Sequence, residues 1–99
     1  MKLQLHETDL VGKWIAEGGK VRADATCERI NQLVAQSLQQ VATDETGWDV
    51  LYRDPDDGRY WELIYPDSHM QGGGPPRLFV LSSEQVRAKY QVEVAPPTR

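Results

Sequence analysis

A five-residue turn, Asp54-Pro55-Asp56-Asp57-Gly58, lies between two segments rich in aromatic and branched residues and constrains the fold more than any other part of the chain. Proline presets the first central position of a type I turn, and the carboxylate of the residue before it can cap that turn. Gly58 can take the left-handed conformation that brings the second strand into register. The pattern therefore predicts a β-hairpin with strands over residues 48–53 and 59–65.

Both faces of this hairpin carry large side chains. In the first strand, alternation places Trp48, Val50 and Tyr52 opposite Asp49, Leu51 and Arg53. In the second strand it places Trp61, Leu63 and Tyr65 opposite Tyr60, Glu62 and Ile64. We expect one face to pack on a helix and the other to be only partly wet, with the three tryptophans (Trp14, Trp48 and Trp61) in the core. The remaining aromatic surface indicates binding.

The segment before the hairpin predicts a helix. Apolar residues repeat at three- and four-residue spacing from Cys27 to Val41, which is typical of an amphipathic helix over residues 24–42. Asp24 is suited to cap its N-terminus. Further upstream, residues 10–16 predict a strand, and Gly18-Gly19 predicts a turn into a short second strand at Val21 and Ala23.

The C-terminal part completes the predicted fold. RLFVL, residues 77–81, reads as a strand, and Ser82 or Ser83 is expected to cap a short helix with Val86 and Tyr90 on one face. The fold class is α+β, with the order β-α-β-β-β-α. It predicts a mostly antiparallel sheet of about four strands, a long helix packed on one face, a short C-terminal helix, and both helices on the same side.

Length and composition limit the function. Ninety-nine residues form one small domain, 1–99, in which residues 1–9 and 93–99 are expected to be loosely ordered. A chain of this size leaves little room for an enclosed cofactor cavity, so none is predicted. The chain shows no apolar run of about 20 residues for a membrane span and no secretory signal. One cysteine, Cys27, excludes an internal disulfide and favours the cytoplasm.

The negative charge is regional. Residues 41–70 hold eight acidic and two basic residues, in a chain whose net charge is −4. Such a field steers basic partners toward the protein and repels nucleic acid. Acidic turns that are simply solvated would produce the same pattern.

Several motifs that could carry chemistry also have structural explanations. Gly72-Gly73-Gly74 precedes Pro75 and Pro76, which offer no N–H groups, so the loop is expected to shape the chain rather than to bind phosphate, with Gly74 extended. The three aspartates of the turn lack the spacing of a calcium loop, and no metal site is predicted. Cys27 is expected to be a buried structural residue. An acid–base pair of Glu62 and His69 is the weaker, catalytic alternative.

The hairpin and the loop after it form the predicted binding surface, because tyrosine, tryptophan and arginine dominate binding hot spots. Its residues are Asp49, Tyr52, Arg53, Asp54, Asp56, Asp57, Arg59, Tyr60, Glu62, Tyr65 and His69. The loop formed by Gly72, Gly73, Gly74, Pro75 and Pro76 is expected to shape this surface. A partly wet sheet face without a partner remains the alternative.

Four motifs carry a family resemblance: LVGKW, ADATCERINQLV, GWDVLYRDPDDGRYWELIYP and GGGPPRL. From Leu10 to Tyr90 the chain resembles the immunity protein 27 family of bacterial polymorphic toxin systems. The resemblance implies a cytoplasmic protein of the producing bacterium that binds the C-terminal domain of a cognate toxin. It gives no site residues, so the surface above rests on the residues alone.

The charge and the resemblance together predict a non-catalytic inhibitor, a monomer or weak dimer, that binds a basic toxin domain without nucleic acid, membrane, metal or cofactor. Two alternatives remain. One is a small enzyme that reverses a toxin's modification with Glu62 and His69, and the other is an adaptor with no toxin partner.

Overall fold

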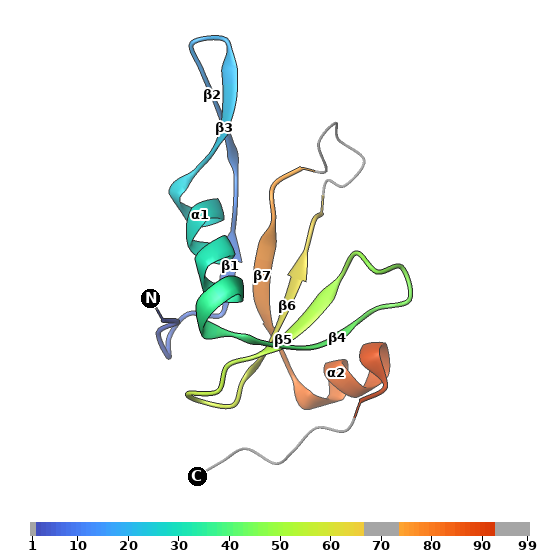
Figure 1. The fold of residues 1–99 in the computed structure, drawn as a ribbon. Helices are drawn as coiled ribbons and strands as arrows, with labels where there is room; N and C mark the ends of the chain where they lie inside the picture. Colours follow the sequence, from blue (N-terminus) through green and yellow to red (C-terminus); the bar gives the residue numbers. More distant parts are fainter. Residues whose placement is uncertain (1, 67–73, 93–99) are drawn as a thin grey trace.

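A computed structural model describes residues 2–66 and 74–92, and its centre is a five-stranded antiparallel sheet. In spatial order the strands are β1 (Asp9–Val11), β7 (Arg77–Leu81), β6 (Tyr60–Ile64), β5 (Val50–Arg53) and β4 (Gln39–Thr43). A separate two-stranded sheet pairs β2 (Trp14–Glu17) with β3 (Lys20–Ala23). The helices are α1 (Ala25–Gln32), a π-helical turn η1 (Leu33–Ser37), and α2 (Ser83–Tyr90) (Figure 1). The α+β class is confirmed, with more strands in the main sheet than the sequence indicated.

The first face of the sheet packs on α1 and η1. Trp61, Leu63 and Tyr52 alternate onto this face and form a core with Ile30 and Leu33 of the helical segment. Trp61 is fully buried. Full burial of one such side chain contributes on the order of 1.5–3 kcal/mol, so this core stabilises the packing of the helical segment on the sheet. The predicted alternation of the hairpin is confirmed here.

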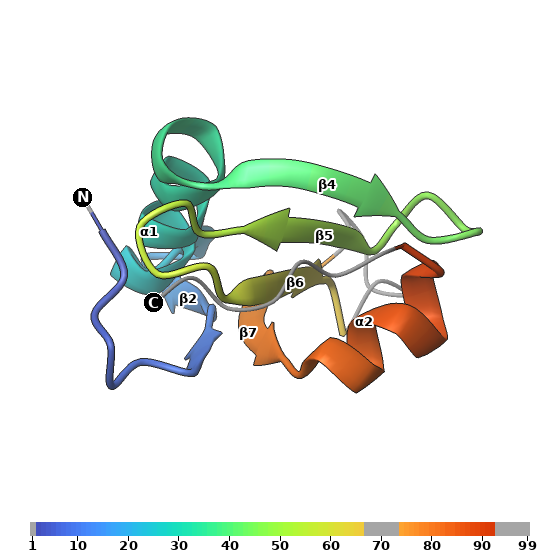
Figure 2. The ribbon, with the colours of Figure 1, turned by 90° about the horizontal axis from the view of Figure 1, so that it is seen from below.

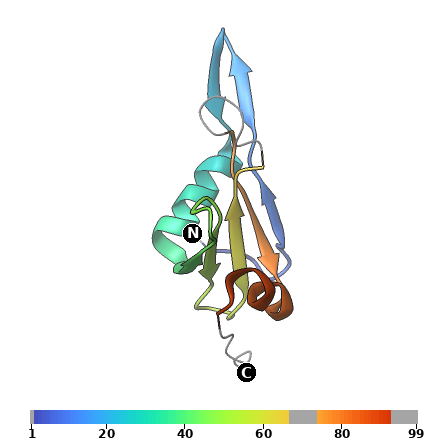
Figure 3. The same cartoon turned by 90° about the vertical axis from the view of Figure 1, so that its right-hand side faces the viewer.

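The second face packs on α2. Leu51 and Tyr60 alternate onto it and form a smaller core with Val86 and Tyr90. Figures 2 and 3 show α1 and α2 on opposite sides of the sheet. The prediction of both helices on one side is therefore wrong. The reason is that the bulky residues on both faces of the hairpin each require a cover.

The C-terminal elements match the sequence-based predictions. Residues 77–81 form β7, and Ser82 caps α2. Its Oγ accepts from Gln85 N at 3.1 Å while Gln85 Oε1 accepts from Ser82 N at 2.8 Å. This reciprocal pair is a capping box, which fixes where the helix begins.

The predicted helix over residues 24–42 is too long. Asp24 does cap α1, accepting from Cys27 N at 2.8 Å, but the chain turns extended at Leu38 (φ −106°, ψ 150°). Residues 39–43 then pair with β5 as an edge strand. Leu38 and Val41 fit the helical spacing, yet Val41 and Thr43 also have the branched side chains that favour strands. Pairing with a buried neighbouring strand decides between the two.

The predicted strand over residues 10–16 divides at Gly12. Its first part pairs with β7 and its second part with β3. Gly12 N donates to Pro76 O at 2.9 Å, and a Cβ at this position would lie 2.6 Å from Cys27 Sγ. Only glycine allows the backbone to pass so close to both neighbours. Beyond this point the β2–β3 hairpin, which we call the ribbon (residues 14–23), projects from the body of the protein (Figures 1 and 3).

Candidate protein-binding surface

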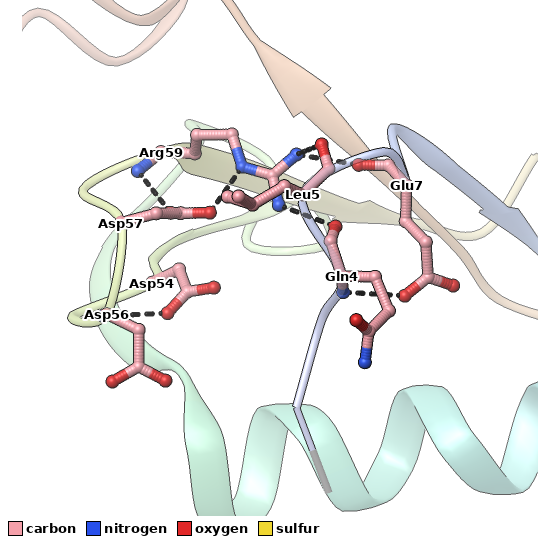
Figure 4. Close-up of polar contacts among 7 residues, drawn as sticks. All are labelled: Gln4, Leu5, Glu7, Asp54, Asp56, Asp57 and Arg59. Carbon is pink, nitrogen blue, oxygen red and sulfur yellow. Dashed lines mark hydrogen bonds and ion pairs between the residues drawn. The ribbon is translucent and has the colours of Figure 1, made fainter.

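The acidic turn between β5 and β6 is held by its own side chains. Asp54 Oδ1 accepts from Asp56 N at 2.9 Å, and Asp54 O accepts from Gly58 N at 2.8 Å. Gly58 has a φ of +81°, as predicted for this position. The carboxylate of Asp57 fixes the chain just before β6, because it accepts hydrogen bonds from Arg59 N at 2.9 Å and from Arg59 Nε at 2.6 Å (Figure 4). The carboxylates of Asp54 and Asp57 therefore stabilise the turn through hydrogen bonds to its backbone.

Arg59 ties the N-terminal segment to this turn. Its guanidinium donates to Glu7 O at 2.6 Å and to Gln4 O at 3.0 Å (Figure 4). Its Cζ also lies 4.9 Å from the ring centroid of Trp61. The planar guanidinium of arginine can donate to two carbonyl groups while it stacks on a ring, and the ammonium of lysine could not do both. Arg59 is therefore already engaged within the chain.

Glu7 extends this arrangement to α1. Its carboxylate forms an ion pair with Arg29 and accepts from Gln4 N at 2.8 Å. The hydrogen bond from Arg29 is the main reason that the pKa of Glu7 is lowered to about 2. Asp54 behaves in the opposite way, because burial raises its pKa, helped by the negative charges of Asp57 and Asp56. Only 5% of Asp54 is exposed.

A second polar cluster joins the sheet to α2. Glu62 Oε2 accepts from Tyr90 OH at 2.6 Å and lies 2.6 Å from Lys89 Nζ, which also pairs with Asp49 at 2.6 Å. Glu62 is 3% exposed. Burial, and then the hydrogen bond to Glu62, raise the pKa of Tyr90. This cluster satisfies a buried carboxylate between two packed elements, which is a structural task.

The structure does not gather the predicted binding residues into one patch. Four of them are buried: Tyr52, Asp54, Tyr60 and Glu62. The others divide between the two ends of β5 and β6. Arg53, Asp56, Asp57 and Arg59 lie at or beside the acidic turn, and Asp49 and Tyr65 lie at the opposite end of the two strands. His69, Gly72 and Gly73 fall outside the described residues.

The most exposed large aromatic residue is Trp48, which was expected in the core. It follows the turn from β4 to β5 and is 59% exposed. Its ring meets that of Tyr65 edge-on, with centroids 6.5 Å apart. The prediction of a buried Trp48 is wrong because β5 begins two residues later, at Val50. Trp48 is the first residue of the predicted strand and directly follows Thr46-Gly47, and this position next to a turn could have indicated that its side chain is exposed.

Acidic residues accompany this aromatic pair, and we call the set Asp44, Glu45, Trp48 and Tyr65 the tryptophan patch. Asp44 Oδ1 accepts from Thr46 Oγ1 at 2.7 Å and from Gly47 N at 3.0 Å, which fixes the turn. These contacts, led by that from Thr46, lower the pKa of Asp44. Glu45 is exposed. A rigid turn thus presents a tryptophan beside negative charge.

The described end of the glycine loop shapes the molecule. Gly74 has a φ of +74°, so the expectation of an extended residue there is wrong. A left-handed φ at a buried site suits only glycine, and it directs the chain into Pro75 and Pro76. Pro76 then accepts the hydrogen bond from Gly12 described above. Whether the loop also contacts a partner remains a prediction.

Three features that could indicate another function are the single thiol, a group of metal ligands and a helix long enough to span a membrane. Cys27 is buried, as predicted, and burial raises the pKa of its thiol. In the ranges 2–66 and 74–92, no three His, Cys, Asp or Glu side chains group as metal ligands would. The helices of the same ranges are too short or too polar to span a membrane.

Comparison with known proteins identifies a family. Searches of curated proteins and of solved structures found no match. A family model described as Immunity protein 27 matches residues 16–82, which is more than half of the chain. The matched range includes the tryptophan patch, the acidic turn and most of the ribbon. The chain belongs to the Immunity protein 27 family.

Proposed function

We propose that this protein neutralises a cognate toxin domain of its own bacterium by direct protein–protein contact, without catalysis. Family membership supports the class of function, and the exposed, acid-flanked Trp48 is the structural observation that supports direct contact. Tryptophan is a frequent hot-spot residue because it buries much area with few rotatable bonds. The proposed setting is the cytoplasm of a polymorphic toxin producer, with the protein acting as a monomer or weak dimer.

The proposed contact centres on the tryptophan patch. It combines an anchor, Trp48, with a neighbouring ring, Tyr65, on a turn that Asp44 has already fixed. A preformed surface loses little conformational entropy on binding, which favours the high affinity that a toxin inhibitor needs. Asp56, which is exposed at the far end of the sheet and pairs with Lys2 at 3.2 Å, would belong to a separate contact.

Charge supports a basic toxin surface as the partner. Glu45 is exposed and Asp44 is half-buried, and neither forms an ion pair with Lys or Arg among the described residues. Attraction between this turn and a basic surface would raise the association rate and would weaken with salt. An affinity that is insensitive to salt, with an acidic contact surface on the toxin, would remove this part of the proposal.

The alternatives have less support. An enzyme built on Glu62 would need an accessible acid or base, yet Glu62 is buried and held by Tyr90 and Lys89. An adaptor with no toxin partner would use the same exposed surface. The neighbouring gene distinguishes it, since an immunity gene is expected to follow one for a secreted protein with a toxin domain.

The test is co-expression with that toxin domain, followed by size-exclusion chromatography and titration of toxicity. We expect a stable complex, and protection that is complete only when the protein equals the toxin in amount. Trp48→Ala should weaken the complex while leaving the fold intact, and Val41→Ala, another exposed apolar residue, serves as its control. Protection at far lower protein amounts would indicate an enzyme, and no complex at micromolar concentration would refute direct inhibition.

A further inference from the structure

The ring of Trp48 is supported by a neighbour and still offers a face to solvent. Its contact with Tyr65 is edge-on, with an angle of 73° between the ring planes, and Tyr65 itself packs against the core of the first face. Because this contact leaves 59% of Trp48 exposed, at least one face of the indole is open. The face of an aromatic ring is partially negative, and the indole binds cations better than the other rings do. The exposed face of Trp48 is therefore suited to a cation.

A charged cluster connects the turn that carries Trp48 to α2. Lys89 of α2 pairs with Asp49, the residue after Trp48, and with the buried Glu62, at 2.6 Å in each case. Burial opposes the charge of Lys89, but its hydrogen bonds to Asp49 and Glu62 outweigh burial and raise its pKa. Lys89 therefore stays protonated, and it holds the turn in place through carboxylates other than those of the tryptophan patch.

The two carboxylates of the tryptophan patch are not neutralised in this way. Asp44 uses its Oδ1 for the turn, through Thr46 and Gly47, and no ion pair involves it within residues 2–66 and 74–92. Glu45 is exposed and has neither an ion pair nor a hydrogen bond in the same ranges. Together with the two carboxylates that Lys89 joins, the group counts four carboxylates and one ammonium, a formal charge of −3. The turn therefore carries more negative charge than the chain itself compensates.

Two other rings of the chain show how a cation can complete such a group. Arg59 Cζ lies 4.9 Å from the ring centroid of Trp61, and Arg77 Cζ lies 4.6 Å from that of Phe79. In both pairs the same guanidinium also binds a carboxylate, at 2.6 Å and 2.8 Å. Trp48 has the ring and the carboxylates of this arrangement, but no cation lies over it among the described residues.

Other occupants fit the tryptophan patch less well. An apolar pocket would cover the ring, but it would also take water from Asp44 and Glu45 without replacing it, which is costly for ionised groups. A nucleic acid would bring phosphates toward the same carboxylates. A second copy that met this one patch to patch would bring together two groups of like charge. A cationic side chain satisfies both the ring and the carboxylates.

We infer that an arginine of the toxin domain occupies the tryptophan patch, an inference that rests on the proposed function. Its guanidinium stacks on the open face of Trp48 and pairs with Asp44 and Glu45. Arginine suits this position better than lysine, because a planar guanidinium can stack on a ring while its N–H groups reach carboxylates. The chain makes the same combination internally, where Arg59 stacks on Trp61 and pairs with a carboxylate of the acidic turn.

Two substitutions of Trp48 distinguish a cation from an apolar contact. Trp48→Phe keeps an aromatic face, although a weaker one, whereas Trp48→Leu keeps apolar bulk and removes the face. We expect Trp48→Leu to raise the Kd for the co-expressed toxin domain at least about tenfold, and Trp48→Phe to raise it only about threefold. Both free proteins should unfold at the temperature of the natural chain, because the side chain is exposed. Equal losses for the two variants would indicate apolar packing and would overturn the inference.

A matched pair of variants tests the role of the carboxylates. Glu45→Gln and Glu28→Gln remove the same charge, but Glu28 is an exposed residue in the first turn of α1. We expect Glu45→Gln to raise the Kd about threefold at low salt and by less at high salt, and Glu28→Gln to change it less than about 1.5-fold. Equal effects would mean that only the net charge acts, and they would contradict a direct pair at the patch.

Substitutions in the toxin domain identify the partner residue and separate this inference from the proposed function. Each arginine and lysine of the toxin is replaced by glutamine in turn, and after loss of the stacked arginine Trp48→Leu should cause no further loss of affinity. Coupling to a lysine alone, or to no basic residue of a toxin that binds, would overturn the inference and leave the proposed function standing. If the natural chain binds no toxin, both fail. A dimer of the free protein that Trp48→Leu dissociates, seen by light scattering, would assign the patch to a second copy.

Discussion

The two hairpins of this protein have strands of similar length, four or five residues, but different roles. The β5–β6 hairpin lies inside the sheet, covered by α1 on one face and α2 on the other, and its turn is closed by Asp54, Asp57 and Arg59. The β2–β3 hairpin stands away from the body, with its described side chains exposed or half-buried. The β5–β6 hairpin, which is richer in aromatic and charged residues, is mostly buried in the fold. The β2–β3 hairpin has fewer such residues and leaves more of its side chains exposed.

Chemical variety in a sequence is therefore a weak guide to function here. In a sheet covered on both faces, tyrosines and carboxylates are needed to pack and to satisfy buried groups, as Tyr90 and Glu62 do. A short ribbon that projects from the body needs few such residues, because it buries little. Three experiments test this contrast.

Truncation of one apolar residue in each hairpin should give the largest difference. Trp61→Ala removes a fully buried ring, so we expect the free energy of unfolding to fall by about 3–5 kcal/mol. Val21→Ala in the ribbon should change it by no more than about 0.5 kcal/mol. Urea unfolding measures both. Trp61→Phe is the control, because it keeps a ring and removes an N–H that has no acceptor among the described residues. Similar losses for Trp61→Ala and Val21→Ala would contradict the contrast.

The joint between the two regions should be the next most sensitive site. Gly12→Ala would place a Cβ 2.6 Å from Cys27 Sγ and 2.7 Å from Pro76 O, at an expected cost of about 1–3 kcal/mol. Adding Cys27→Ala removes the sulfur atom and should recover part of this loss. Thermal unfolding of the two variants measures the effect. A Gly12→Ala protein as stable as the natural chain would mean that the support of the ribbon is loose.

The smallest effect concerns the N-terminal segment and its dependence on pH. Arg29 lowers the pKa of Glu7 from 4.5 to about 2, so the folded state favours the ionised carboxylate. This stabilisation is complete above pH 4.5 and is lost as the pH falls toward 2, by at most about 3 kcal/mol and by less where solvent screens the pair. Unfolding of Glu7→Gln at several pH values should show a smaller loss over this window. An unchanged pH profile would remove the proposed role of the pair.

Local chemistry predicted a large part of the fold. The Asp54–Gly58 turn, the Asp24 and Ser82 caps and the Gly18-Gly19 turn were all evident, because each depends on residues close in the sequence. The errors depend on distant pairing. Residues 39–43 became a strand because β5 offered a partner, and α2 covered the second face of the sheet because Leu51 and Tyr60 needed burial. The spacing of apolar residues in the sequence cannot predict either the strand pairing or the position of α2.

The candidate surface was harder to predict. The sequence drew attention to the hairpin, but it could not show that Tyr52 and Tyr60 turn inward or that Trp48 lies beyond the end of its strand. The alternation of the ribbon could be read only after the register of β2 and β3 was known, since two residues per strand on each face give too short a pattern.

Amide hydrogen exchange of the protein, alone and with its toxin domain, tests most directly whether the turn that carries Trp48 binds the toxin. In the free protein we expect slow exchange in β5 and β6 and fast exchange in the ribbon and in the turn before Trp48. Toxin should slow exchange over residues 44–49 and leave β5 and β6 nearly unchanged. A complex that leaves residues 44–49 unprotected would contradict the account.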